Sequence, residues 1–473
     1  MPHATRNAHW GEPAIARLQV DNPFTQDLAC EVPLAGWGEI EGVLDAARAG
    51  ALLAEAMPLA ARKQLVERAV AHMEAQSETI SRAVTQMMGK PLAQAAGELR
   101  TLASRARTMI ELADRGLAPI DAGGDDGIAR RILKVPLGVV LDLPAWNYPL
   151  LTAVNVVMPA VLAGNAVIVK HSPRSPLCGP MFADAFRAAG ADPRIVQSLD
   201  CTHEQSERMV GDPRIDHVVF TGSVHGGTRI SQASAGRFLS IGYELGGNDP
   251  AYVAADADLA RSVDGLVDGA MYNAGQSCCA VERAYVHASH YADFVAGAER
   301  LAAAYVLGDP LAAETTLGPI AQPQHVAELE ALVKDAVQRG AKLVTGGKRT
   351  SVGGRGRFFQ PTVLADVPSD AQLMRVEQFG PILAVARVAS DAEALARMND
   401  SVFGLTASVW TADRERAERF AAALRFGTVF MNRCDFGDPR LPWSGVGQSG
   451  RGHSMSVLGF DSLTRTRSLH FRA

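Results

Sequence analysis

Short apolar segments alternate with helical segments between residues 137 and 247. The apolar segments are GVVLDLP, AVIVK, RIVQSL and HVVFTGS, which have the length of buried strands. Strands of this kind separated by helices are typical of a parallel sheet covered on both faces. A second series, from about residue 248 to 432, includes PAYVAA, AVERAYVHA, TVLADV, ILAVARV and TASVWT. The chain is therefore predicted to be an α/β protein.

The size and charge of the chain limit the classes of protein to which it can belong. Its 473 residues are too many for one hydrophobic core, so two or three domains are expected. A hydrophobic content of 47% with 21% charged residues is that of an ordinary globular protein. The net charge is −5 and there is no dense run of lysine or arginine, so we expect neither nucleic acid nor a membrane as partner.

One apolar stretch, residues 151 to 169, has nearly the length of a membrane span but not its composition. It contains Asn155, Pro159 and the pair Gly164-Asn165. We interpret it as a buried helix to about Ala163, a turn and a buried strand.

The cysteines and the start of the chain indicate the compartment. The six cysteines are scattered without a C-x-x-C pair, which is typical of free thiols in a reducing environment. The first residues, MPHATRNAHWGEPAIARL, lack the apolar core of a signal peptide, so a cytoplasmic location is expected. His287 and His290 have no third ligand at suitable spacing, and no metal is predicted.

Helical and strand patterns also occur outside the two series. Residues 41 to 114 show helical spacing, and Pro58 suits the first turn of a new helix. In the last helix Thr411 or Asp413 can cap the N-terminus, and Gly427 is expected to end it. The tail SLTRTRSLHF alternates, which predicts a solitary strand in need of a partner, for example from another subunit.

Two strand ends have features of a nucleotide site, which in such a sheet lies where a strand ends and a helix begins. After HVVFTGS, the backbone of Gly222 and the hydroxyl of Ser223 could hold a pyrophosphate, with Gly227 four residues further on. After AVIV, the ammonium of Lys170 could meet phosphate or ribose oxygens. Each could also be a simple turn. The G-x-G-x-x-G match at 445 to 450 has no room for a strand–helix–strand unit, so we interpret it as a flexible loop.

Two adjacent cysteines, Cys278 and Cys279, lie in NAGQSCCAVER. An isolated cysteine is more often a small buried residue than a nucleophile, and a thiol that attacks a carbonyl needs an oxyanion donor and a general base. Asn147, held between prolines and aromatic residues in PAWNYP, is a candidate donor or a turn former. Glu244, between an apolar stretch and two glycines, is a candidate base with a raised pKa or a surface strand end.

Together these segments resemble the aldehyde dehydrogenase superfamily. WNYP, FTGS, ELGG, NAGQSCCAVER and EQFGP occur in the family's order, and the match extends from DNPFTQD near residue 21, through GKPLAQAAGEL, to the tail. The resemblance implies a Rossmann-like cofactor domain, an α/β catalytic domain and a small β-strand arm that joins subunits into homodimers or homotetramers. The implied boundaries are 1–117 with 137–247, 248–440, and 118–136 with 456–473, respectively.

The resemblance implies roles for individual residues. Cys278 would be the nucleophile and Cys279 a spectator, Asn147 and the Cys278 amide would form the oxyanion hole, and Glu244 would activate the deacylating water. Lys170 would contact a cofactor ribose, Ser223 the pyrophosphate and Glu377 the nicotinamide ribose. The other cofactor contacts implied are Trp146, Ser172, Pro173, Gly222, Gly227, Leu245, Gly246 and Phe379. The implied aldehyde pocket comprises Tyr148, Leu151, Val154, Ser277, Cys279, Asp435 and Phe436.

The implied reaction oxidises an aldehyde to a carboxylic acid with NAD or NADP, through a thiohemiacetal and a thioester. Many members have a glutamate that binds the adenosine ribose at the position of Pro173, which Arg174 follows here. Loss of this acid removes repulsion against a 2′-phosphate, and Arg174 could attract one; NAD is placed slightly ahead of NADP. Gly447 and Ser454 replace the family's usual lysine and glutamate.

Other functions are weighed against this one. A cofactor-independent cysteine thioesterase would need a histidine beside the thiol, and the matching motifs contain none. A protein of this fold kept only for binding would be expected to lose Cys278, Asn147 or Glu244, and all three are present. The presence of Glu244 also favours hydrolysis of the thioester over its transfer to coenzyme A. The mostly apolar pocket favours an aliphatic or aromatic aldehyde, whereas Arg433 could pair with the carboxylate of a succinate-semialdehyde-type substrate.

Overall fold

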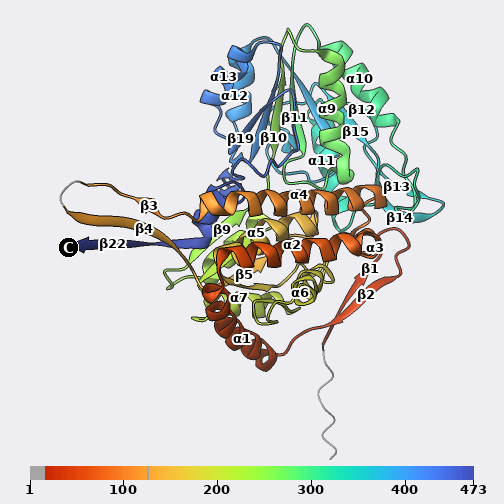
Figure 1. The fold of residues 1–473 in the computed structure, drawn as a ribbon. Helices are drawn as coiled ribbons and strands as arrows, with labels where there is room; N and C mark the ends of the chain where they lie inside the picture. The colour runs from red at the N-terminus through yellow and green to blue at the C-terminus, as the bar shows by residue number, and fades with distance from the viewer. Residues whose placement is uncertain (1–15, 125–126, 473) are drawn as a thin grey trace, which may run out of the picture.

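The computed structural model describes residues 16–124 and 127–472. In these residues two mostly parallel sheets flanked by helices lie one above the other, and a slender arm projects to one side (Figure 1). The predicted α/β class is confirmed. Helix α4 (Leu92–Gly116) runs horizontally across the middle of the view in Figure 1. No helix in the described residues is long and apolar enough to cross a membrane.

The lower sheet in Figure 1 has six strands in the order β21-β9-β8-β5-β6-β7. They are β5 (Val139–Leu143), β6 (Ala166–Val169), β7 (Val196–Ser198), β8 (His217–Thr221), β9 (Ser240–Glu244) and β21 (Gly450–Arg451). All neighbours are parallel except β21 and β9. The chain runs outward from β5 to β7 and then returns to β8 on the other side of β5. Such a reversal creates a ligand-binding crevice at the carboxyl ends of the two central strands.

This sheet is apolar on both faces, which explains its uninterrupted apolar strands. Val140 packs into the core on one face, and Val139 and Leu141 pack into the core on the other. The first core includes α2 (Leu59–Ala75), α3 (Ser77–Met88), α4, α5 (Pro149–Ala163) and α6 (Cys178–Ala188), and the second includes α1 (Trp37–Ala56), α7 (His203–Gly211) and α8 (Val224–Ala233). The stretch 151–169 is the rest of α5, a turn at Gly164 with φ of +93°, and β6, so its interpretation as buried helix and strand is confirmed.

The upper sheet has seven strands in the order β12-β15-β16-β11-β10-β18-β19, and only the edge strand β12 is antiparallel to its neighbour. Its strands are β10 (Asp249–Val253), β11 (Val281–His287), β12 (Lys342–Thr345), β15 (Thr362–Ala365), β16 (Ile382–Val388), β18 (Thr406–Trp410) and β19 (Thr428–Met431). The helices between them are α9 (Leu259–Met271), α10 (Tyr291–Ala303), α11 (His325–Gln338), α12 (Asp391–Asn399) and α13 (Arg414–Ala423).

The last helix begins as predicted but ends earlier. The Asp413 side chain accepts hydrogen bonds from the amides of Glu415 and Arg416 and caps α13. The prediction that Gly427 ends this helix is wrong, because α13 stops at Ala423. Gly427 instead allows a close approach of two backbones, since a Cβ there would lie 1.8 Å from the Ser444 carbonyl oxygen.

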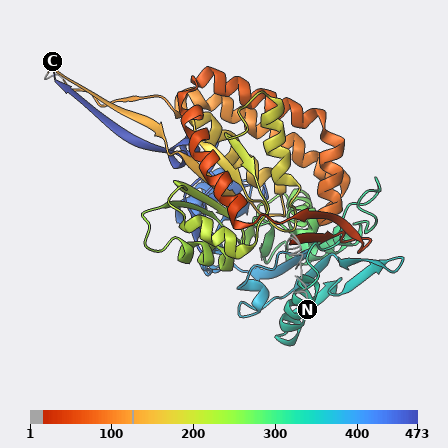
Figure 2. The ribbon, with the colours of Figure 1, turned by 90° about the horizontal axis from the view of Figure 1, so that it is seen from below.

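The arm is a three-stranded sheet of β3 (Ile120–Asp121), β4 (Ile128–Pro136) and β22 (Thr464–Arg472). The two long strands are antiparallel from Thr464 opposite Pro136 to Arg472 opposite Ile128. The partner that the tail strand was predicted to need is therefore β4 of the same chain. Figure 2 shows the arm extending away from the body, with the C-terminus near its tip.

Short strand pairs complete the fold. β1 (Arg17–Asp21) pairs with β2 (Leu28–Pro33), β13 (Arg349–Val352) with β14 (Arg355–Phe359), and β17 (Phe403–Gly404) with β20 (Val446–Gly447). The interpretation of residues 445–450 as a flexible loop is wrong. They reach from β20 into β21, Ser449 is fully buried, and its carbonyl accepts the Leu245 amide at 3.0 Å. The segment thus covers the edge of the six-stranded sheet beside β9.

Candidate active site

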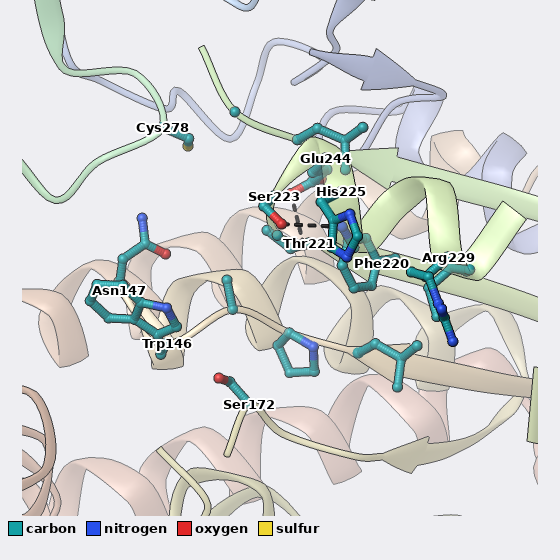
Figure 3. A pocket seen from close by; sticks show the side chains of 18 of the residues that line it. Trp146, Asn147, Ser172, Phe220, Thr221, Ser223, His225, Arg229, Glu244 and Cys278 are labelled. Atoms are coloured by element: carbon teal, nitrogen blue, oxygen red, sulfur yellow. Dashed lines mark hydrogen bonds between the residues drawn. The ribbon is translucent and has the colours of Figure 1, made fainter. Parts of the chain in front are cut away.

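A cleft of about 670 Å³ lies at the carboxyl ends of the central strands β5 and β8. Much of its wall comes from the ends of four strands and the residues that follow them: 143–147 at β5, 170–173 after β6, 220–226 at β8 and 244–246 at β9. The switch in strand order thus places the predicted nucleotide segments in one cavity (Figure 3).

The start of α8 suits a phosphate group. Ser223 caps this helix by accepting a hydrogen bond from the Gly226 amide at 3.1 Å, and the cleft reaches both residues. A Cβ at Gly222 would lie 2.7 Å from the Phe220 ring, and one at Gly226 would lie 2.6 Å from it. The bare backbone therefore fits around this ring and leaves the helix N-terminus open to an anion.

The ammonium of Lys170 adds positive charge to the same cleft. Lys170 is 5% exposed, lines the cleft, and has a pKa lowered by burial. Ser172 and Pro173 also line it. Helix amides, glycine backbone and a buried cation together fit the phosphates and riboses of a dinucleotide.

Glu377 and Phe379 line another part of the cleft. Glu377 accepts a hydrogen bond from the Gly247 amide at 3.1 Å, and burial raises its pKa well above the usual value. A Cβ at Gly246 would lie 2.2 Å from the Glu377 carboxylate, so glycine is required there. The Phe379 ring packs edge-on against Trp146, with centroids 5.6 Å apart.

Glu282, to which we had given no role from the sequence, supports this part of the cleft. The side chain is buried and accepts hydrogen bonds from the Gln378 and Phe379 amides, each at 3.0 Å from Oε1. Burial raises the pKa of Glu282 to about 7. A glutamate inside the apolar strand AVERAYV is the signal that could have revealed it.

The loop before the thiol has an unusual backbone. Asn273, Ala274 and Gly275 all have left-handed φ angles, of 54°, 55° and 68°. A Cβ at Gly275 would lie 2.1 Å from the Gly380 carbonyl oxygen, so this loop packs directly on the EQFGP segment. Gln276 accepts a hydrogen bond from the Ala321 amide at 2.9 Å. The motif NAGQ thus builds a tightly held turn that presents the next residues.

Cys278, Asn147 and Glu244 line the cleft from three different segments (Figure 3). Cys278 is partly exposed, whereas Asn147 is 4% exposed. In Figure 3 the Asn147 carboxamide points towards the side of the cleft that carries Cys278. The structure therefore brings together the residues of the predicted thiol chemistry.

Glu244 is held by hydroxyl groups. It accepts a hydrogen bond from Ser454 and a long one, of 3.5 Å, from Thr221. Burial raises the pKa of Glu244, while these hydrogen bonds and the charge of Arg105 oppose the rise. The raised pKa expected from the sequence is thus confirmed in direction, and Ser454 makes a contact that the sequence did not reveal.

The second thiol faces away from the cleft. Cys279 and Ser277 are buried, and both donate to Asp435 Oδ1, at 3.0 and 3.1 Å. A hydrogen bond with Cys278 and burial raise the pKa of Cys279 well above the usual value. Burial also raises the pKa of Asp435, to about 6. Cys279 is therefore a poor thiolate at neutral pH.

Several predicted residues lie outside the cleft. Gly227 packs against Leu245, since a Cβ there would lie 2.9 Å from that side chain. Arg174 does not face the cleft, because its guanidinium binds the Asp21 carboxylate and donates to the Asp21 carbonyl at 2.6 Å. The idea that Arg174 attracts a 2′-phosphate is therefore wrong for this structure. The expected pocket residues that do not line the cleft are Tyr148, Leu151, Val154, Ser277, Cys279, Asp435 and Phe436.

The cleft also contains basic side chains that we had not predicted. His203, His225 and Arg229 line it, and Arg229 forms an ion pair with Glu207 at 2.7 Å. In residues 16–124 and 127–472, no group of three or more His, Cys, Asp or Glu side chains is placed to hold a metal ion.

A doubly covered parallel sheet with a dinucleotide-sized cleft that ends at a thiol defines a class of nucleotide-dependent α/β enzyme. Comparison with protein families matches residues 10–469 to the aldehyde dehydrogenase family. The succinate semialdehyde dehydrogenase [NAD(P)+] Sad of Escherichia coli is 34% identical over 451 residues, or 95% of this chain and 96% of that protein. The succinate-semialdehyde dehydrogenase [NADP(+)] of Deinococcus radiodurans is 32% identical over 446 residues, or 94% and 93%.

Solved structures agree with this match. The succinic semialdehyde dehydrogenase of Streptococcus pyogenes, in complex with NADP+, superposes with a TM-score of 0.92 at 28% identity, covering 96% of this chain and 100% of that one. Lactaldehyde dehydrogenase of Escherichia coli superposes with a TM-score of 0.93 at 29% identity, covering 98% of this chain and 97% of that one. The chain belongs to the aldehyde dehydrogenase family, as its motifs predicted, and has its Rossmann-like and catalytic fold. It is accordingly an enzyme that oxidises an aldehyde with NAD(P).

Proposed function

We propose that this enzyme oxidises a short aldehyde bearing a carboxylate, of the succinate semialdehyde type, to a dicarboxylic acid. Relatives from Deinococcus, Escherichia, Mycobacterium and Synechocystis are all named succinate-semialdehyde dehydrogenases, and each matches at least 84% of this chain. This agreement carries the proposal. It favours the carboxylated substrate over the aliphatic or aromatic aldehyde expected from the apolar pocket.

We assign the chemistry to Cys278, Asn147 and Glu244. The Cys278 thiolate adds to the aldehyde carbon, and the oxyanion so formed accepts hydrogen bonds from the Asn147 carboxamide and the Cys278 amide. Lys170, the α8 N-terminus and Glu377 would hold NAD(P)+, which would accept the hydride that leaves this carbon.

Hydrolysis completes the reaction. Glu244 takes a proton from the water that attacks the thioester, the carbon–sulfur bond breaks, and the carboxylic acid leaves with the thiolate restored. Aldehyde, NAD(P)+ and water are consumed, and acid, NAD(P)H and protons are formed. The partial exposure of Cys278 and the raised pKa of Glu244 support these roles.

We further propose NADP as the preferred cofactor. Pro173 lines the cleft where many family members carry an acid, so no carboxylate at that position repels a 2′-phosphate. The relatives are named for NADP(+) or NAD(P)+, which gives no support to the slight preference for NAD expected earlier.

For the organisation of the molecule, we propose a cofactor domain of residues 1–117 and 137–247 and a catalytic domain of 248–440. The arm of 118–136 and 456–473 would pair subunits into a dimer or tetramer. Its projection from the body and the exposure of Phe471, at 62%, support this role. The free cysteines fit the predicted cytoplasmic location.

The test is NAD(P)H formation at 340 nm with succinate semialdehyde, butanal and benzaldehyde, each with NAD+ and with NADP+. The Cys278→Ala variant is the control. Oxidation that is fastest with succinate semialdehyde and NADP+, and is lost in the variant, is the expected result. Faster oxidation of butanal or benzaldehyde would contradict the proposed substrate class.

A further inference from the structure

Arg105, in the middle of α4, is a guanidinium without a counter-ion in the part of the chain that the structure describes. One terminal nitrogen donates to the Asn155 carboxamide oxygen at 3.1 Å, and the other lies 3.5 Å from the Gly437 carbonyl oxygen. The Nε atom is buried and has no hydrogen-bond partner. No described carboxylate accepts a hydrogen bond from this side chain. Burial of a cation without an anion is costly, and burial lowers the pKa of Arg105.

The neighbouring buried charges are satisfied by other groups. Lys90 and Glu98 form a buried ion pair, and Glu98 also accepts a hydrogen bond from the Leu150 amide at 2.8 Å. Asp435 accepts from a hydroxyl and a thiol, and Glu244 accepts from two hydroxyls. Arg105 is thus left as a cation with unused donors beside the reaction site.

The contacts of Arg105 lie beside residues that the resemblance assigns to the aldehyde pocket. Asn155 lies two helical turns after Tyr148 and one after Leu151, on the face of α5 that is expected to line the aldehyde pocket. Gly437 directly follows Phe436, another expected pocket residue. The charges of Glu244 and Glu98 favour the charged form of Arg105. The guanidinium is thus held between α5 and the loop at Gly437.

Gly437 makes room for the guanidinium. A Cβ at this position would lie 2.5 Å from an Arg105 terminal nitrogen. The absence of a side chain therefore lets the loop close over Arg105 without displacing it. A larger residue at Gly437 would therefore displace the Arg105 guanidinium without removing its charge.

Arg433, which the sequence suggested as a partner for a substrate carboxylate, is in a less favourable position for that role. Its guanidinium stacks on the Phe436 ring at 3.4 Å. It lines a cavity of about 400 Å³ that Phe436 also lines, together with Asp264, Asp268 and Asp435, whose carboxylates would repel that of the substrate.

We propose that Arg105 is the residue that binds the carboxylate of the substrate and so determines specificity for carboxylated aldehydes. The proposal rests on the proposed function, and it names the group that recognises the substrate. A planar guanidinium with free donors matches the two oxygens of a carboxylate. The substrate carboxylate then supplies the hydrogen-bonded counter-ion that Arg105 lacks among the described residues.

The decisive experiment compares succinate semialdehyde with its methyl ester, which has the same chain but no charge. In Arg105→Met, kcat/KM for the acid should fall by about 100-fold or more, while kcat/KM for the ester stays within about threefold of wild type. Arg105→Lys keeps the positive charge but loses the planar guanidinium. Its kcat/KM for the acid should lie between those of wild type and Arg105→Met. Gly437→Ala should also lower kcat/KM for the acid selectively. Arg433→Met is the matched control and should behave as wild type.

Equal losses on acid and ester in Arg105→Met would overturn the proposal and indicate that Arg105 acts through Glu244, with a shifted pH profile of kcat. A selective loss in Arg433→Met instead would overturn it in favour of that residue. Wild type that oxidises the ester as well as the acid would also overturn it, leaving aldehyde oxidation itself intact.

A binding measurement separates this proposal from the proposed function. In the Cys278→Ala background, which cannot react, calorimetry with succinate should detect binding that the further change Arg105→Met abolishes. Undiminished binding in the double variant would overturn the role of Arg105 whatever the activity of the wild type. Circular dichroism and thermal melting show whether each variant is folded.

Discussion

The side-chain amide of Asn273 donates a hydrogen bond to the backbone carbonyl of Asn147 at 3.1 Å, across 126 positions in the sequence. The same amide donates to the Gln276 carbonyl at 3.0 Å, inside the turn that carries Cys278. One side chain therefore fixes the thiol loop and the proposed oxyanion donor relative to each other. Its left-handed backbone, with φ of 54°, is strained and is held by these bonds.

We predict that Asn147→Ala and Asn273→Ala both slow the enzyme but to different extents. Loss of one oxyanion donor typically costs about 3 kcal/mol, so Asn147→Ala should lower kcat by about 100-fold. Asn273→Ala removes no group that contacts the oxyanion and should lower kcat by about tenfold through misplacement. Steady-state kinetics on folded variants test this order. Wild-type kcat in Asn273→Ala would contradict the positioning role.

We predict that Glu244→Gln separates the two halves of the reaction. The amide cannot take a proton from water, so the thioester should accumulate after one round of hydride transfer. Rapid mixing should show a burst of about one NAD(P)H per active site, followed by turnover reduced by about 100-fold or more. A variant with slow turnover and no burst would instead place Glu244 before the thioester.

Deacylation should depend on pH through Glu244, whose carboxylate is the active form. Burial raises its pKa above the ordinary value of 4.5, so the rate should rise as pH increases through this higher value. The Ser454 hydroxyl stabilises the carboxylate and lowers the pKa. Ser454→Ala should therefore move the midpoint of the rate profile to higher pH. An unchanged midpoint, measured under conditions of limiting deacylation, would contradict this assignment.

Local patterns predicted most of the fold but not the contacts between distant segments. The apolar run at 151–169 was enough to place a buried helix, a glycine turn and a strand, because burial on both faces leaves no polar residues in the pattern. The pairing of the tail with β4 depends on a segment more than 300 residues earlier, and nothing local in the tail encodes that partner. The prediction of a flexible loop at 445–450 is wrong for the same reason, because this segment covers β9, which lies about 200 residues earlier and is not evident from the local sequence.

The residues of the site divide in the same way, into those that local sequence patterns reveal and those that only contacts between distant segments reveal. Cys278, Asn147, Glu244 and Lys170 each follow a recognisable strand or motif, so sequence reasoning could bring them together. Arg105 looks like one more polar residue on an amphipathic helix. That it donates to an amide and a carbonyl, and to no carboxylate among the described residues, becomes visible only when α4, α5 and the late loop meet.

We predict that Glu282 makes stability depend on pH. Its pKa is raised to about 7 in the folded protein, compared with 4.5 ordinarily, so the folded state retains a proton that the unfolded state has lost between these values. Stability from this group therefore falls as pH rises from about 4.5 to 7. Glu282→Gln should lack this component, so the difference in melting temperature between wild type and variant should change between pH 5 and pH 7.5. A constant difference would contradict the raised pKa.

Cofactor choice should respond to a single charge at Pro173. A glutamate there would place a carboxylate in the cleft, where it repels the 2′-phosphate of NADP but can accept hydrogen bonds from the ribose hydroxyls of NAD. We expect Pro173→Glu to lower kcat/KM for NADP+ by about tenfold or more while kcat/KM for NAD+ is kept or raised. Pro173→Gln, which has the same length without the charge, separates repulsion from loss of the proline ring. Equal effects of the two substitutions on NADP+ would show that backbone shape at this turn, and not charge, sets the preference.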